Sequence, residues 1–119
     1  MSINFSNDKP IFIQLAELIK SDIISGKFKS NDKLPSVREF AFDYSVNPNT
    51  VQKALQMLED DGLIITDRTN GKFVANNPNQ IKAQKNKIIN EELQLFIEKM
   101  QGFGLSVNEI KELINKIGE

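Results

Sequence analysis

The chain lacks the two residue types on which much protein chemistry depends. Its 119 residues include no cysteine and no histidine. This excludes disulfides, thiol nucleophiles, Ser-His-Asp triads and the usual ligand sets for zinc and haem. The carboxylates are scattered, apart from Glu59 next to Asp60 and Asp61, and do not follow the spacing of a calcium loop. We therefore expect no catalytic residues, no metal and no cofactor, and we do not expect an enzyme.

Strong net charge and long apolar runs are missing as well. The 15 basic and 16 acidic residues give a formal net charge of -1, whereas nucleic-acid-binding proteins are typically basic. DNA binding would then require Arg38, Lys53, Arg68 and Lys72 to gather on one surface. The sequence has no apolar run of membrane-spanning length and no signal peptide, so we expect a soluble, cytoplasmic protein that does not bind membranes.

Residues 34–55, LPSVREFAFDYSVNPNTVQKAL, predict two helices joined by a tight turn. Ser36 and Glu39 form the Ser-x-x-Glu pattern in which each side chain caps the backbone amide of the other, so a short helix begins directly after Ser36. Asn47 is a preferred N-cap residue, and Pro48 suits the first position of a helix. A second helix therefore begins at Pro48, and the whole stretch is typical of a helix-turn-helix.

The second of these helices divides into two faces at its 3.6-residue period. Its apolar face consists of Val51, Ala54, Leu55 and Leu58. The opposite face carries Asn49, Lys53 and Gln56, and Thr50 can reach a phosphate. Asn and Gln pair with adenine, and Lys donates to guanine or phosphate, so this face could read bases in the major groove. These residues fit an ordinary helical hairpin with a solvated face equally well.

A further helix and a β-hairpin flank this stretch. The first helix is predicted between Pro10 and Gly26, and Lys33-Leu34 predicts one short strand. Residues 63–65 and 72–75 read as paired strands, with Asn70-Gly71 as a type I′ turn between them. A helix-turn-helix followed by a hairpin is a winged helix, although a hairpin alone is more often structural. Near the N-terminus, Ile3 and Phe5 are expected to pack onto a neighbouring element.

Five segments in register carry a resemblance to a known family. They are Pro10-Ile11-Phe12-x-Gln14-Leu15, Gly26, Lys33-Leu34-Pro35-Ser36-x-Arg38-Glu39, Val46-Asn47-Pro48-Asn49-Thr50-Val51-x-Lys53-Ala54-Leu55 and Gly62-Leu63-Ile64. In order and spacing they resemble the N-terminal domain of GntR-family bacterial transcription regulators, over about residues 10–76. The resemblance implies a winged-helix domain in which Arg38, Asn49, Thr50, Lys53 and the wing contact an operator. The wing departs from the family pattern, because Asp67 and Thr69 replace residues of its usual Arg- and Gly-rich motif.

The remaining residues predict two amphipathic helices. The first should end near Gly102, and Ser106 with Glu109 repeats the reciprocal capping pattern at the start of the second. Two helices cannot enclose a ligand cavity of ordinary size, and this tail resembles that of the short YtrA-type members of the family. We expect it to form a dimer interface; packing against the winged domain is the alternative. The expected interface residues are Ile89, Leu93, Phe96, Ile97, Met100, Ile110, Leu113, Ile114 and Ile117.

Taken together, these patterns predict a mainly α fold with a small β-wing: a winged helix-turn-helix DNA-binding domain in residues 1–76, and a two-helix dimerisation segment in residues 77–119. The expected function is a homodimeric repressor that binds a palindromic operator on double-stranded DNA. The alternative is a winged-helix module that binds protein. A small-molecule effector is compatible with the sequence, but no feature indicates one. The residues expected to contact DNA are Ser36, Arg38, Asn49, Thr50, Gln52, Lys53, Gln56, Arg68, Asn70, Gly71 and Lys72.

Overall fold

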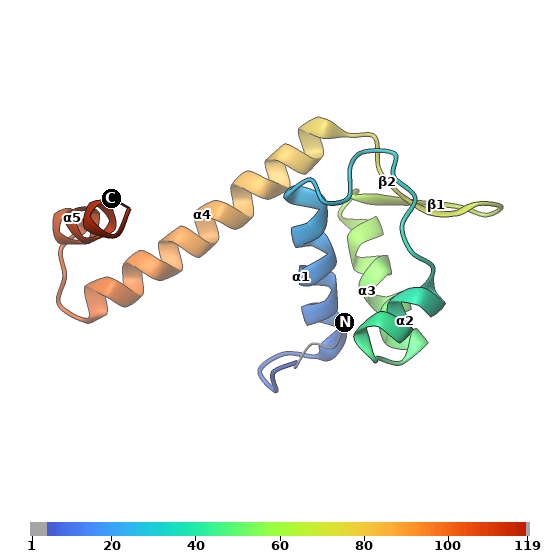
Figure 1. Ribbon diagram of the computed structural model, residues 1–119, viewed down its shortest axis with the longest axis horizontal. Coiled ribbons are helices and arrows are strands. Elements are labelled where there is room, and N and C mark those ends of the chain that lie inside the picture. Colours follow the sequence, from blue (N-terminus) through green and yellow to red (C-terminus); the bar gives the residue numbers. More distant parts are fainter. Residues whose placement is uncertain (1–4, 119) are drawn as a thin grey trace. The chain divides into compact units, whose positions relative to one another are not determined.

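The computed structural model describes residues 5–118. The elements follow in the order α1 (Ile11–Ile24), α2 (Val37–Tyr44), α3 (Pro48–Asp60), β1 (Ile64–Asp67), β2 (Gly71–Val74), α4 (Pro78–Gly102) and α5 (Val107–Ile117) (Figure 1). They form two compact units, the first ending at Lys82 and the second starting at Ala83. The mainly α fold with a small β-wing is therefore confirmed. Of the two N-terminal residues expected to pack, Phe5 lies against the core of the first unit, and Ile3 lies outside the described residues.

The helices of the first unit begin where local side chains satisfy free backbone amides. The Ser36 hydroxyl accepts from the backbone N–H of Glu39 at 3.1 Å, and the Glu39 carboxylate accepts from that of Ser36 at 3.1 Å. At the start of α3, the Asn47 side chain accepts from the N–H of Asn49 at 2.8 Å. Between the two helices Ser45 takes a left-handed conformation, φ 55°, which ends α2. Both predicted helix starts are confirmed.

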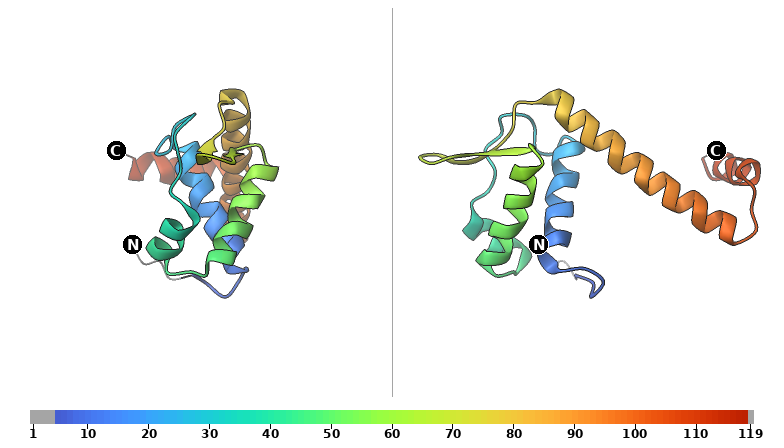
Figure 2. Two further views of the ribbon diagram at one scale, coloured as in Figure 1. Left: turned by 90° about the vertical axis from the view of Figure 1, so that its right-hand side faces the viewer. Right: turned by 180° about the vertical axis from the view of Figure 1, so that it is seen from behind.

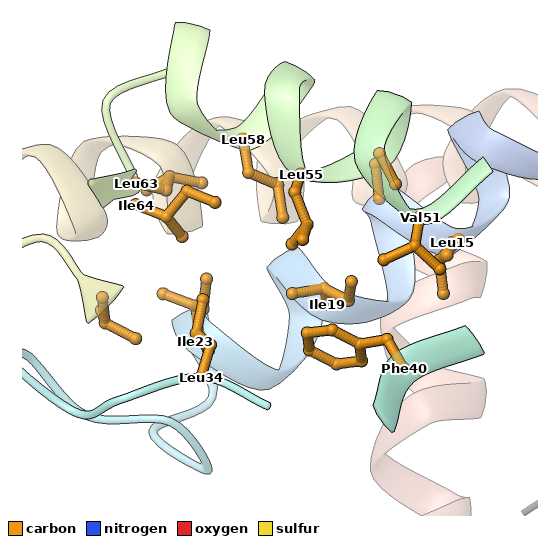
Figure 3. Close-up of a cluster of buried hydrophobic side chains, with 13 residues drawn as sticks. Leu15, Ile19, Ile23, Leu34, Phe40, Val51, Leu55, Leu58, Leu63 and Ile64 are labelled. Carbon is orange, nitrogen blue, oxygen red and sulfur yellow. The ribbon is translucent and has the colours of Figure 1, made fainter. Parts of the chain in front are cut away.

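The core of the first unit lies between α1 and α3, which lie side by side in each view (Figures 1 and 2). Ile19 of α1 faces Leu55 of α3, and Leu15 lies beside Val51; all four side chains are fully buried (Figure 3). Burial of one such side chain contributes about 1.5–3 kcal/mol to folding. Phe40 brings α2 onto the same core, and Ile64 brings the hairpin. Because these apolar faces point inward, the polar faces of α2 and α3 are left to solvent.

The hairpin projects beyond the helices of the first unit (Figures 1 and 2). Its two strands are antiparallel, and their register runs from the pair Ile64 and Val74 to the pair Asp67 and Gly71. The predicted type I′ turn at Asn70-Gly71 is wrong, because such a turn needs positive φ at both residues and only Gly71 of the pair has it, at 105°. The Asp67 carboxylate instead accepts from the backbone N–H groups of Thr69 and Asn70, at 2.9 and 3.2 Å. It thereby holds a longer loop of residues 68–70.

The predicted strand at Lys33-Leu34 is present as a single bridge. Lys33 pairs with Phe73, and the N–H of Leu34 donates to the Lys72 carbonyl at 2.8 Å. The segment before α2 thus runs beside β2 as a third, very short strand. This contact fixes the wing relative to the start of α2.

The start of α4 is held by the first unit. The Asn77 side chain accepts from the N–H of Gln80 at 3.3 Å, and the Gln80 side-chain amide donates to the Asp61 carbonyl at 3.0 Å. Ile81 packs against the core. The expected division between residues 76 and 77 lies just before α4. Because of these contacts, the first compact unit extends into α4 as far as Lys82.

Replacing Gln80 should test this attachment. We expect Gln80→Ala to lower the free energy of unfolding of the first unit by about 0.5–1.5 kcal/mol, because the part-buried Asp61 carbonyl loses its partner. Urea denaturation measures the change. Gln84→Ala removes the same side chain one turn further along α4 and is the matched control. Equal losses in the two variants would contradict a specific role for the Gln80 hydrogen bond.

The second unit contains the rest of α4 and all of α5. Ser106 and Glu109 form the predicted capping box, with hydrogen bonds of 3.0 and 3.2 Å, and Ile110 is buried. No helix among residues 5–118 is both long enough and apolar enough to cross a bilayer. Much of the apolar surface of the second unit is exposed. Its large exposed apolar side chains are Ile89, Leu93, Leu95, Phe96, Phe103, Val107, Leu113, Ile114 and Ile117.

Candidate nucleic-acid interface

The N-terminal half of α3 presents most of the residues expected to read DNA. Asn49, Gln52 and Lys53 are exposed there, and Thr50 is half-buried. Because the free N–H groups and the helix dipole make this end attractive to anions, a phosphate near Thr50 would be favoured. Arg38 is exposed on α2. These groups are available for contact, since they form no part of the core.

Two of the expected contact residues outside the wing already form side-chain hydrogen bonds within the protein. The Ser36 hydroxyl accepts the amide of Glu39, and the hydrogen bonds from Ser36 hold the pKa of the Glu39 carboxyl below its usual range. The Gln56 amide donates to the Asp60 carboxylate at 2.9 Å, toward the C-terminal end of α3. To contact DNA, Gln56 would have to give up this bond, and Ser36 would have to turn its hydroxyl proton away from the Glu39 carboxylate.

The wing tip carries one hydrogen-bonded carboxylate, Asp67, and one exposed cation, Arg68. Hydrogen bonds from the backbone of Thr69 and then of Asn70 lower the pKa of the Asp67 carboxyl, so Asp67 is ionised but turned into the loop. Arg68 next to it is exposed. The Lys72 ammonium donates to the Thr66 hydroxyl at 2.7 Å and lies 3.7 Å from the Glu59 carboxylate. Of the two wing cations, Arg68 is therefore the freer to meet DNA.

A cleft of about 380 Å³ lies between the wing and the start of α2. Lys33, Arg68 and Lys72 line it together with Ser36 and Glu39. Its basic residues outnumber its one carboxylate, Glu39, whose oxygen is occupied by the cap of α2. The cleft can therefore attract a sugar-phosphate strand.

Sequence reasoning did not include Lys33 among the contact residues. The bridge between Lys33 and Phe73 places Lys33 against the wing, where its side chain passes Gly71; a Cβ at that glycine would lie 3.5 Å from the Lys33 Cε. The pairing joins residues forty positions apart, and a single lysine carries no local signal of it. Only the strand prediction at Lys33-Leu34 pointed in this direction.

The acidic end of α3 is less repulsive toward DNA than its sequence suggests. Asp61 forms an ion pair with Lys20 at 3.2 Å, and Glu59 lies near Lys72. Asp60 accepts the hydrogen bond from Gln56. Since Asp61 and Glu59 each have a cationic partner, their field on a nearby phosphate is reduced. In residues 5–118, no group of three or more acidic residues is arranged to hold a metal ion.

Comparison with known proteins identifies the family. Residues 13–74 match the family model described as bacterial regulatory proteins, gntR family. The chain is 35% identical to the HTH-type transcriptional regulator YhcF of Bacillus subtilis, over 100% of this chain and 98% of that protein. It is 34% identical to the HTH-type transcriptional repressor YtrA of Bacillus subtilis, over 98% and 91%.

Solved structures agree in fold. A GntR family transcriptional regulator from Listeria monocytogenes matches with a TM-score of 0.88 and 34% identity, over 94% of this chain and 98% of that one. The DNA-binding domain of AraR in complex with operator ORX1 matches with a TM-score of 0.58 and 28% identity, over 63% of this chain and 95% of that one. The chain belongs to the GntR family of bacterial regulatory proteins and is a transcriptional regulator with a winged-helix DNA-binding domain.

Proposed function

We propose that this regulator is a homodimeric repressor that binds a palindromic operator through α3 and the wing. The observation that carries the proposal is the exposed set Asn49, Gln52 and Lys53 on the capped N-terminal half of α3. Their amide and ammonium groups match the hydrogen-bonding edges of adenine and guanine in the major groove. The AraR domain, whose fold is similar, is seen in complex with an operator. Within this scheme residues 1–76 bind DNA and residues 77–119 join two subunits.

The proposed contacts divide into reading and positioning groups. Asn49, Gln52 and Lys53 approach base edges, and Arg38 approaches a base or the adjacent backbone. Thr50 and Ser36 donate hydroxyl protons to phosphates. The wing supplies Arg68, Asn70, Gly71 and Lys72, among which Arg68 is the principal phosphate contact. Gln56 contributes least, since its amide is already bonded to Asp60.

The dimer is proposed because the tail exposes large apolar side chains on both of its helices. Leu93 is 50% exposed and Phe96 41% exposed on α4, and Ile114 is 50% exposed on α5. Apolar side chains at such spacing are usually buried, and an exposed patch of this kind marks an interaction site. A second copy of the tail supplies the same surface, as a two-fold interface requires. Two winged domains held in this way match the two-fold symmetry of a palindromic site.

Repression is the proposed effect on transcription. YtrA, which aligns along 98% of this chain, is an HTH-type transcriptional repressor. A dimer that covers a promoter blocks transcription by occupying it, and this requires no further domain. A mobility-shift titration on the DNA upstream of the protein's own gene, followed by transcription of that DNA with and without the protein, tests both steps.

The salt dependence of binding separates this proposal from the alternative, a protein-binding module, which the net charge of -1 permits. If the dimer neutralises ~6–10 phosphates, the logarithm of the affinity falls with the logarithm of the salt concentration by about 0.9 per contact. Arg68→Ala should reduce this slope by about one per contacting subunit. Lys72→Ala should reduce it less, because Lys72 is held by Thr66 and Glu59. A flat response in the wild type would favour the protein-binding alternative.

A further inference from the structure

Phe12, in the first turn of α1, lies beside the proposed reading face of α3. The ammonium nitrogen of Lys53 lies over the Phe12 ring, 5.7 Å from its centroid. Phe12 is only half-buried, and among the described residues it belongs neither to the core cluster nor to the apolar side chains that pack against it. The Phe12 ring therefore contacts the Lys53 ammonium and is not part of the core cluster.

A lysine on an exposed helix face is normally mobile, because four rotatable bonds separate its charge from the backbone. A ring face attracts an ammonium through its quadrupole and limits the positions that the charge visits. Lys53 has no carboxylate within ion-pairing distance among residues 5–118, so no ion pair in that part of the chain competes with the ring. Ordering the side chain before DNA arrives reduces the entropy that binding would otherwise lose.

We propose that Phe12 is a positioning residue, which holds the Lys53 ammonium ready for an oxygen acceptor of the DNA. The acceptor is either a backbone phosphate at the edge of the major groove or the O6 atom of guanine. This inference rests on the proposed DNA-reading role of Lys53. It adds that α1, which packs behind α3, contributes to recognition through one aromatic ring.

A double-mutant cycle with the full chain tests the inference. Phe12→Leu should weaken binding to the upstream DNA about 2–5-fold, the range expected for an exposed cation–π contact. In a Lys53→Met background the same substitution should have no effect, because the charge that the ring holds is gone. Phe12→Tyr keeps a ring face and should restore wild-type affinity. Thermal unfolding of Phe12→Leu should stay close to that of the wild type, since the core does not use Phe12.

Phe5→Leu is the matched control, because Phe5 packs against the core. It should lower thermal stability without any coupling to Lys53. An unchanged or raised affinity of Phe12→Leu, or the same loss in the Lys53→Met background, would overturn the positioning role. If instead Lys53→Met alone binds like the wild type, the proposed reading role of Lys53 fails first.

The two acceptors differ in how the loss depends on sequence and salt. With a phosphate acceptor, Lys53→Met weakens binding to all sequences alike and reduces the salt slope by about one per contact. With guanine, the loss is confined to sites that carry the base, and substituting that base removes the difference between wild type and variant. A Phe12→Leu loss that followed neither pattern would overturn the inference.

Discussion

A chain ending at Lys82 is expected to fold, to remain monomeric and to bind a two-half-site operator ~10²–10⁴-fold more weakly than the full chain. The first unit has its own core between α1, α3 and the hairpin. It loses the exposed apolar surface of α4 and α5 through which we propose that two subunits join. With both half-sites engaged by one dimer, the second contact is intramolecular, and the shortened chain loses that advantage.

The point of truncation matters for this experiment. Ending the chain at residue 77 would remove Gln80 and Ile81, which bond to α3 and pack on the core. Loss of binding could then reflect a destabilised winged domain. Ending at Lys82 keeps both residues. Circular dichroism and thermal unfolding check the fold, and light scattering coupled to gel filtration gives the mass.

A full-length variant separates dimerisation from chain length. Leu93→Lys places a charge in the exposed apolar stripe of α4 and should give a monomer with the same loss of affinity, since Leu93 is half-exposed and its replacement does not disturb the core. Gln94→Lys makes the neighbouring change outside the stripe and should remain dimeric. A wild-type chain that is monomeric by scattering would remove the dimerisation role from the tail, as would a shortened chain that binds as tightly as the intact one.

Arg38→Ala and Lys53→Ala are each expected to weaken operator binding by ~1–3 kcal/mol if the side chain makes a good base contact. Both side chains are exposed and lie outside the core, so the variants should unfold at nearly the wild-type temperature. Fluorescence anisotropy with labelled operator gives the affinities. Lys27→Ala is the matched control: it removes one cation on the loop after α1, paired with Asp22 at 3.8 Å. Wild-type affinity in both test variants would contradict the assignment of the reading face.

Local signals predicted the helical part of the fold well. Ser36, Glu39 and Asn47 cap helices through atoms within three residues of one another, so the sequence contains the whole interaction. The apolar face of α3 follows in the same way from its 3.6-residue period. Leu55 is predicted to be buried and is fully buried.

The wing was harder to predict, because interactions compete there. Asn70-Gly71 is a strong turn signal, yet the Asp67 carboxylate accepts from the backbone N–H groups of Thr69 and Asn70 and stabilises a longer loop. The position of Lys33 depends on a strand pairing with Phe73, which residue types alone do not encode. The contact of Phe12 with Lys53 likewise depends on how α1 packs on α3. Each case needs the tertiary arrangement.

The most direct test of the account is selection of binding sites from random duplex DNA by the full chain. We expect the selected sequences to contain two inverted half-sites with centres near one helical turn apart, ~34–36 Å. The Lys82-terminated chain, at the same concentration, should select weakly or recover single half-sites. Enrichment of no common sequence by the full chain would contradict sequence-specific binding, and enrichment of single, unpaired half-sites would contradict the dimer.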